Sequence, residues 1–113
     1  MSSQKRNVDY VLEQIGAAGN VSARAMFGEY AFYCDGKVVA LFCDDQLFVK
    51  PTNAGAAFVG KVTEGIPYPG AKPQMLIGGE KWDDAEWLSA LVRMTADELP
   101  IPKVKKKKTK SIP

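Results

Sequence analysis

Cys34 and Cys43 are the side chains best suited to nucleophilic chemistry, and Tyr33 and the carboxylates could supply an acid or a base. The chain contains no histidine, so the commonest proton shuttle, triad base and metal ligand are all missing. No activating partner stands beside either cysteine in the sequence, although Arg24 or a lysine could activate a thiol in space. A small enzyme with a reactive cysteine is therefore one hypothesis. A non-enzymatic module without catalytic residues is the favoured one.

Two further motifs have structural interpretations. Asp83, Asp84 and Glu86 form a carboxylate cluster at the start of one predicted helix, where acidic side chains cap the helix. A metal site would need ligands that converge from several directions. The run Gly78-Gly79-Glu80-Lys81 lacks the spacing of a phosphate-binding loop. We therefore predict neither a metal nor a cofactor.

The segment from residue 24 to residue 50 contains most of the aromatic side chains, so its fold decides where they lie. Glu29–Cys34 and Lys37–Cys43 are apolar runs joined by Asp35-Gly36, a strong hairpin signal, and a further strand follows Asp44-Asp45. The result is an antiparallel meander. Two-residue loops predict the following pairs: Cys34 with Lys37, Phe32 with Val39, Tyr30 with Leu41, Cys43 with Gln46, and Leu41 with Phe48.

This register puts apolar residues on both faces of the meander. One predicted face carries Tyr30, Phe32, Val39, Leu41 and Phe48; the other carries Ala31, Tyr33, Val38, Ala40, Phe42, Leu47 and Val49. A helix should cover Phe32, Leu41 and Phe48, and the opposite face needs either a lid from residues 54–62 or a second copy in a homodimer. The same register separates the two cysteines, so we predict free thiols.

Helical patterns flank the meander. Residues 7–18 read as an amphipathic helix with Val8, Val11, Leu12 and Ile15 on its apolar face. A last helix begins at an Asp83 or Asp84 cap, with Asp83 and Glu86 resembling a capping box, and ends near Glu98. Its predicted buried stripe contains Trp87, Leu88, Leu91, Val92 and Thr95. Between these helices we expect a short helix over 54–62, an ordered loop over 63–73 and an additional or edge strand over 74–77.

The fold class that follows is α+β: an antiparallel β-sheet, with a meander over residues 21–50 and a short strand near 74–77, and flanking N-terminal and C-terminal helices. Within the loop, Tyr68 could pack or contact a ligand, and core packing is the favoured use. Arg24 and Lys50 lie near ends of the sheet, where an anion-binding pair and a solvated role are alternatives. No apolar run is long enough to cross a membrane and no signal peptide is evident, so we expect a cytoplasmic protein without membrane contact.

Charge divides the chain into a domain over residues 1–102 and a disordered lysine-rich tail over 103–113. The chain has 15 basic and 13 acidic residues, and six lysines fall in the tail, so residues 1–102 keep nine basic residues against all 13 acidic ones, a net charge near −4. The tail is either a solubilising end or a contact for nucleic acid through Lys103, Lys105, Lys106, Lys107, Lys108 and Lys110.

The 24–50 segment also carries a recognisable pattern: R-x-M-F-G-x-Y, an aromatic pair, D-G, A-L, a D-x turn and L-[FY]-x-K. Its residues are Arg24, Met26, Phe27, Gly28, Tyr30, Phe32, Tyr33, Asp35, Gly36, Ala40, Leu41, Asp44, Leu47, Phe48 and Lys50. This pattern resembles the N-terminal domain of the TfoX/Sxy family. Ala31 and Asp45 depart from it, because the family usually has glycine at both positions.

The resemblance implies a bacterial regulatory or interaction module that binds a protein partner. Members of the family include regulators of natural competence for DNA uptake, which act on transcription. The family's second, C-terminal domain is expected to be missing here, so the resemblance is to the N-terminal domain standing alone.

Overall fold

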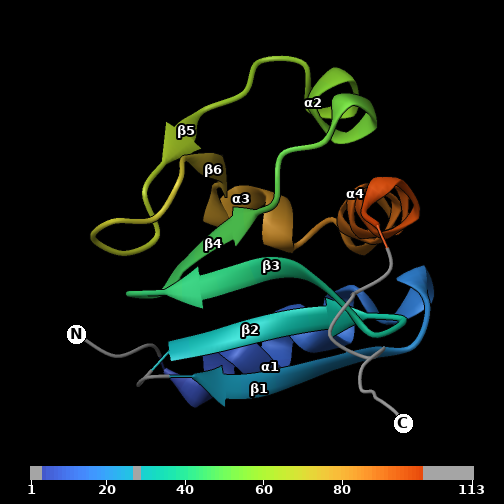
Figure 1. Ribbon diagram of the computed structural model, residues 1–113. Helices are drawn as coiled ribbons and strands as arrows, with labels where there is room; N and C mark the ends of the chain where they lie inside the picture. Colours follow the sequence, from blue (N-terminus) through green and yellow to red (C-terminus); the bar gives the residue numbers. More distant parts are fainter. Residues whose placement is uncertain (1–3, 27–28, 101–113) are drawn as a thin grey trace, which may run out of the picture.

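The computed structural model describes residues 4–26 and 29–100, which form an antiparallel sheet with helices along one side (Figure 1). The strands are β1 (Val21–Met26), β2 (Glu29–Cys34), β3 (Lys37–Cys43), β4 (Gln46–Val49), β5 (Glu64–Gly65) and β6 (Gln74–Ile77), in the spatial order β1-β2-β3-β4-β6-β5. The helices are α1 (Lys5–Gln14), a 3₁₀ turn η1 (Gly16–Ala18), α2 (Asn53–Val59), α3 (Gly79–Trp82) and α4 (Ala85–Glu98). The α+β prediction is confirmed.

The β2–β3 hairpin contains a bulge that the sequence did not indicate. The turn pairs Cys34 with Lys37 as expected, but beyond it Phe32 lies opposite Ala40 and Tyr30 opposite Phe42. The predicted pairs of Phe32 with Val39 and Tyr30 with Leu41 are therefore wrong. One extra residue on a strand turns every later side chain to the other face, so the predicted face assignments fail beyond Val39. The β3–β4 pairs, including Leu41 with Phe48, are confirmed.

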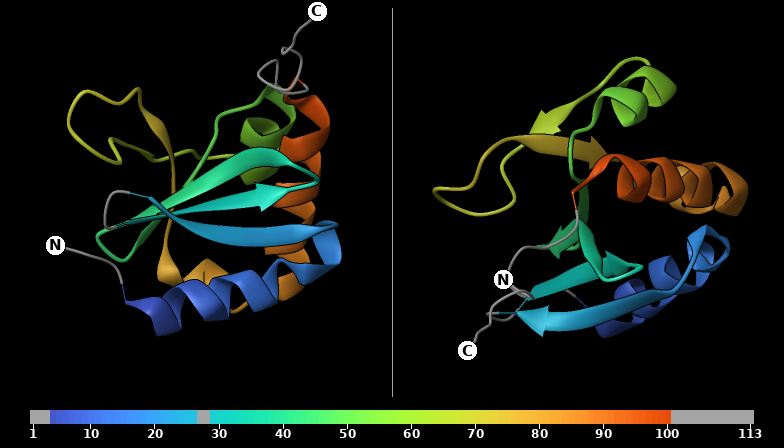
Figure 2. Two further views of the ribbon diagram at one scale, coloured as in Figure 1. Left: turned by 60° about the horizontal axis from the view of Figure 1, so that its bottom comes forward. Right: turned by 45° about the vertical axis from the view of Figure 1, so that its right-hand side comes forward.

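The main core lies between the sheet and the helices, which Figure 2 shows together on one side of the curved sheet. Phe32 and Phe42 pack edge to face with ring centroids 6.1 Å apart, and the ring centroid of Trp82 lies 5.3 Å from that of Phe42. Helix α1 contributes Val8 and Val11. Helix α4 contributes its buried stripe: Leu88, Ser89, Leu91, Val92, Thr95 and Ala96. Trp87 is only partly buried, unlike the prediction.

A second apolar cluster occupies the opposite side of the sheet, which we call the outer face. Ala31, Leu41, Cys43 and Phe48 are buried there, with Tyr33, Val38 and Leu76 packed against them. No residue of a described helix belongs to this cluster. The expectation that a helix covers Phe32, Leu41 and Phe48 together is wrong, because Phe32 lies in the main core. Gly65 of β5 comes so close to Phe48 that an added Cβ would stand 2.8 Å from its ring, and this contact helps to cover the outer face.

Helix α2 does not act as the predicted lid. It packs against α4, and Ala56 and Val59 join the main core. Strand β6 is confirmed, although it is not at the edge, since β5 pairs with its far side. The cap of α4 is Asp84, whose carboxylate accepts from the Trp87 N–H at 3.1 Å, whereas Asp83 ends α3.

Cys34 and Cys43 are free, as expected, and both are buried. Across residues 4–26 and 29–100, none of the helices has the length and apolar character needed to cross a bilayer. Phe27, Gly28 and the lysines of the tail lie outside the described residues, so the boundary between domain and tail remains a prediction.

Candidate functional site

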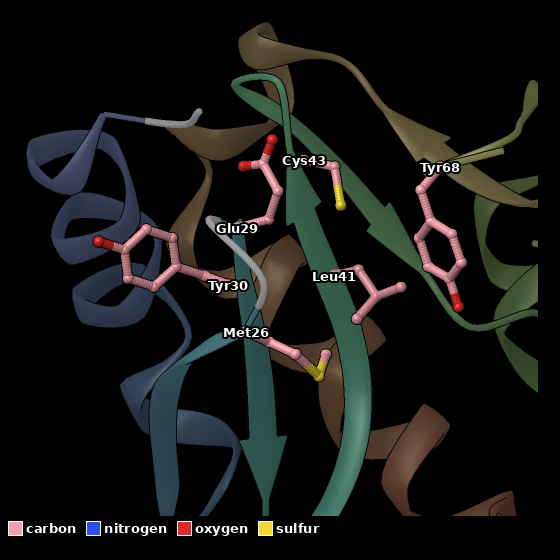
Figure 3. A pocket seen from close by; sticks show the side chains of 6 residues that line it. All are labelled: Met26, Glu29, Tyr30, Leu41, Cys43 and Tyr68. Atoms are coloured by element: carbon pink, nitrogen blue, oxygen red, sulfur yellow. The ribbon is translucent and has the colours of Figure 1, made fainter. Parts of the chain in front are cut away.

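A cavity of about 350 Å³ opens on the outer face, between the sheet and the loop that joins β5 to β6. Figure 3 shows its lining, which comes from three strands and the loop. The lining residues are Met26, Glu29, Tyr30, Leu41, Cys43 and Tyr68.

The strand pairing explains why these residues meet. Met26 ends β1 and lies directly opposite Glu29, which begins β2. Side chains alternate along a strand, and the bulge in the β2–β3 pair directs Leu41 and Cys43 to the same face as Glu29. The ring of Tyr30 instead points toward α1, on the other side of the sheet (Figure 3). The cavity therefore depends on the register of the hairpin.

Tyr68 closes the cavity from the loop. Its side chain is 53% exposed, so the expectation that it packs in the core is wrong. Pro67 before it is buried and anchors the loop, while Tyr68 turns outward. A turn follows, in which the Ala71 N–H donates to the Tyr68 carbonyl at 3.0 Å and Gly70 adopts a φ of +89°. The loop thus presents an aromatic ring over Leu41 and Cys43 without burying it.

Glu29 is the acidic residue of the lining. One of its carboxylate oxygens accepts a hydrogen bond from the Asp44 N–H at 3.1 Å, which fixes it beside the β3–β4 turn. Cys43 lies close by, and burial together with the charge of Glu29 raises the pKa of its thiol. The thiol is therefore protonated at neutral pH, and protonated thiols are poor nucleophiles.

Cys34 belongs to the main core, away from the cavity. Its thiol lies 3.8 Å from the Ala18 carbonyl, and burial followed by the charge of Asp35 raises its pKa, against a smaller opposing effect of Arg93. Neither cysteine has the electropositive and accessible surroundings of a reactive thiol. Within the described residues, no group of three potential ligands is placed to hold a metal ion.

Asp35 has a structural role that the motif did not reveal. Its carboxylate accepts from the Asn20 N–H at 3.0 Å and from Arg93 at 2.8 Å, and these contacts lower its pKa, the Asn20 bond most. Arg93 also donates to the Ala18 carbonyl and pairs with Asp97. Sequence reasoning missed Arg93, although its spacing of four residues from Asp97 on a helix is a usable signal.

The remaining motif residues are spread over the sheet. Arg24 stacks on the Tyr33 ring at 5.6 Å, and Lys50 borders a separate hollow with Glu64 and Lys72. Two strands, β2 and β3, separate Arg24 from Lys50, so the structure does not bring this cation pair together. Phe32 and Leu47 are buried in the main core. Met26 and Leu41 are the motif residues whose side chains meet at the cavity, and Tyr30 borders it with its ring turned away.

Two comparisons relate this chain to known proteins. The family model of the TfoX N-terminal domain matches residues 13–99. A protein of Spirochaeta aurantia, described as an uncharacterized 12.7 kDa protein in the trpE 5′ region, is 40% identical over 111 residues, which cover 98% of this chain and 96% of that relative. The matched segment contains every strand and every helix except α1, of which only the last two residues, 13 and 14, are included. The chain therefore belongs to the TfoX N-terminal domain family.

Proposed function

We propose that this protein is a non-enzymatic regulatory module that holds a segment of a protein partner in the outer-face cavity. The observation that carries the proposal is the chemistry of the lining. Met26, Leu41 and Tyr68 offer apolar contact, and Glu29 adds a fixed carboxylate. Met26 and Tyr68 are 38% and 53% exposed, so both are accessible to a partner.

The lining selects a partner of defined chemistry. A volume of about 350 Å³ is small for a ligand pocket and suits one or two side chains of a peptide. Methionine adapts to different apolar groups, and the tyrosine ring offers a flat apolar surface that also attracts cations. An apolar residue next to a lysine or arginine therefore fits best, because the cation can pair with Glu29.

The enzyme hypothesis is less well supported. A reaction at Cys43 would need a thiolate, and the burial and negative charge at this position oppose one. Membership of the TfoX family favours a regulatory role, because relatives in the family include regulators of DNA-uptake competence that act on transcription. We extend that role, and a cytoplasmic location, to this chain as part of the proposal.

Phage display of random heptapeptides on the immobilised full chain tests the proposal. The expected result is enrichment of peptides with Leu, Phe or Met adjacent to Lys or Arg. Tyr68→Ala should weaken a selected peptide at least about tenfold, since about 1.4 kcal/mol of aromatic contact is lost. Ile66→Ala is the matched control, because Ile66 is 52% exposed in the same loop but does not line the cavity. Unpatterned selection, or full binding by Tyr68→Ala, would contradict the proposal.

The lysine tail supports a second proposal, contact with nucleic acid. Its six lysines carry point charges that suit phosphates, whereas the remainder of the chain is acidic. Such contact would give the regulatory module an affinity for DNA that does not depend on the base sequence.

A further inference from the structure

Strand β1 forms an open edge of the sheet. It has six residues and stands last in the strand order, pairing with β2 on one side; among the described residues nothing pairs with its other side (Figure 1). The opposite edge is β5, which has two residues. An open strand of this length presents a row of main-chain donors and acceptors to another strand.

The outward-facing groups of β1 can be assigned. The Asp35 N–H donates to the Asn20 carbonyl at 2.9 Å, so the main-chain groups of residue 20 point toward β2. In an antiparallel strand this direction alternates from residue to residue. Ser22, Arg24 and Met26 therefore also face β2. The N–H and C=O groups of Val21, Ala23 and Ala25 point away from the sheet.

The usual protection of an edge strand is missing from β1. The strand contains no proline, and its pairing with β2 runs through six consecutive residue pairs without a bulge. Arg24 is its one charged residue, and most of its other side chains are small. Natural edge strands are commonly protected by lysines, prolines, bulges or short length.

We propose that β1 pairs antiparallel with β1 of a second copy, about a two-fold axis through Ala23. In this register Ala23 lies opposite Ala23 of the other copy, Val21 opposite Ala25, and Ser22 opposite Arg24. Each of the three outward-facing residues then lies opposite an outward-facing residue of the other copy. Each of these three pairs can exchange two main-chain hydrogen bonds, roughly six in total. The neighbouring two-fold register would set Arg24 against Arg24, which like-charge repulsion disfavours.

The proposal commits to a second copy because the strand is complementary to itself. The outward-facing residues Val21, Ala23 and Ala25 are centred on Ala23, so a two-fold axis at that residue satisfies every one of them. Val21 and Ala23 also pack against the main core. Two copies would thus join their sheets with small residues on the core side. The homodimer forms through the sheet edge and leaves the outer-face cavity open.

Sedimentation equilibrium of the full chain tests this interface. The chain mass is 12.3 kDa, so the dimer should weigh about twice that value. Ala25→Pro removes one outward N–H and no bond to β2, and it should raise the dimer dissociation constant at least about tenfold with an unchanged circular-dichroism spectrum. Ala25→Ser keeps the N–H and is the matched control. A monomeric wild type at millimolar concentration, or a dimer that Ala25→Pro leaves intact, would overturn the proposal.

Cross-linking gives an independent readout if Ala25→Pro fails to fold. Ala23→Cys should form an intermolecular disulfide under mild oxidation, because opposite residues of such a pair lie within disulfide range. Glu64→Cys on the opposite edge is the control and should not cross-link. The native cysteines are both buried, which keeps the background low. Equal cross-linking at both positions would mean random collision and would contradict the interface, as would no cross-linking at position 23.

Discussion

Phe32 of β2 lies opposite Ala40 of β3, and this pairing places Leu41 on the outer face beside Cys43 and Phe48. Val39 is the extra residue of the bulge, and both Val39 and Ala40 face the main core. Without the bulge, Leu41 would point toward the helices and the cavity would lose one of its walls. A local irregularity of one residue thus decides where the candidate site forms.

Truncating a side chain on the core face of the sheet should lower the free energy of unfolding more than truncating one on the outer face. Phe42→Ala should lower the free energy of unfolding by roughly 3–5 kcal/mol, because Phe42 is fully buried against Phe32 and Trp82. Leu41→Ala should cost about 2 kcal/mol, near the lower end for leucines, since its small cluster borders an open cavity. Urea denaturation of both variants checks the order. A larger loss for Leu41→Ala would mean that the face assignment is incorrect.

Asp35 should make stability depend on pH. Its pKa is lowered in the folded chain by the Asn20 N–H and then by Arg93, so the carboxylate stays ionised to lower pH than in the unfolded chain. This contribution is present above the unfolded pKa, about 3.9, and is lost as pH falls through the lower folded value.

The comparison of wild type with Asp35→Asn measures this effect. The gap in unfolding free energy should be constant from about pH 7 to pH 5 and should shrink below about pH 4. Asp9→Asn is a control, because Asp9 forms an exposed bridge with Lys5. A gap for Asp35→Asn that stays constant to pH 2 would contradict the role assigned to this carboxylate.

Asp45 should stabilise the start of α1 despite its left-handed backbone. Its φ is 56°, and its carboxylate accepts from the Gln4 N–H at 2.8 Å and from Asn7 at 3.2 Å. Asp45→Ala loses the acceptor and adds backbone strain, because alanine tolerates a positive φ less well than aspartate, so it should cost about 1–2 kcal/mol. Asp45→Asn keeps an oxygen acceptor and a side chain that tolerates the left-handed conformation, so it should cost less. Thermal unfolding compares the two variants, and equal losses would rule out the hydrogen bonds as the cause.

The sequence predicted the strands of the meander well because turn chemistry is local. Asp35-Gly36 and Asp44-Asp45 fix where each hairpin reverses, and all four adopt positive φ angles in the structure. The bulge at Val39 depends on how Phe32 and Ala40 pack with helices distant in the sequence. No local pattern encodes that packing, so the faces of the sheet could not be assigned correctly.

The candidate site was only partly predictable for the same reason. Met26 and Leu41 belong to the recognisable family pattern, but their meeting with Tyr68 requires the loop before β6 to fold over the sheet. The burial of Pro67 and the turn at Gly70 position that loop, and these features are tertiary. The sequence predicted an ordered loop over 63–73 but did not indicate which of its side chains would be buried.

The lysine tail should bind DNA weakly and without sequence preference. With up to about six phosphates neutralised, the log–log salt slope should be no steeper than roughly −5 for duplex DNA. Fluorescence anisotropy on two unrelated duplexes, with the full chain and with a chain ending at residue 102, measures this slope. Unchanged affinity after deletion would move the contact to the rest of the chain, and no binding by either form would leave the tail as a solubilising end.

The carboxylate in the cavity should discriminate between peptides. Glu29→Gln should weaken a selected peptide with a lysine or arginine by about threefold to tenfold, and should leave unchanged a version in which that cation is replaced by norleucine. Glu64→Gln is the control, because Glu64 is an exposed carboxylate on β5. Isothermal titration calorimetry measures the dissociation constant of each peptide for each variant. Equal losses for the two peptides would mean that Glu29 shapes the cavity without pairing with a cation.

The most direct test of the binding proposal is the methyl spectrum of the methionines during titration with a selected peptide. Met26 lines the cavity, whereas Met75 is buried in the main core and serves as an internal reference. With ¹³C-methyl methionine, the Met26 signal should shift and saturate with the peptide while the Met75 signal stays in place. Peptide binding seen by calorimetry with an unmoved Met26 signal would contradict the claim that the cavity is the binding site.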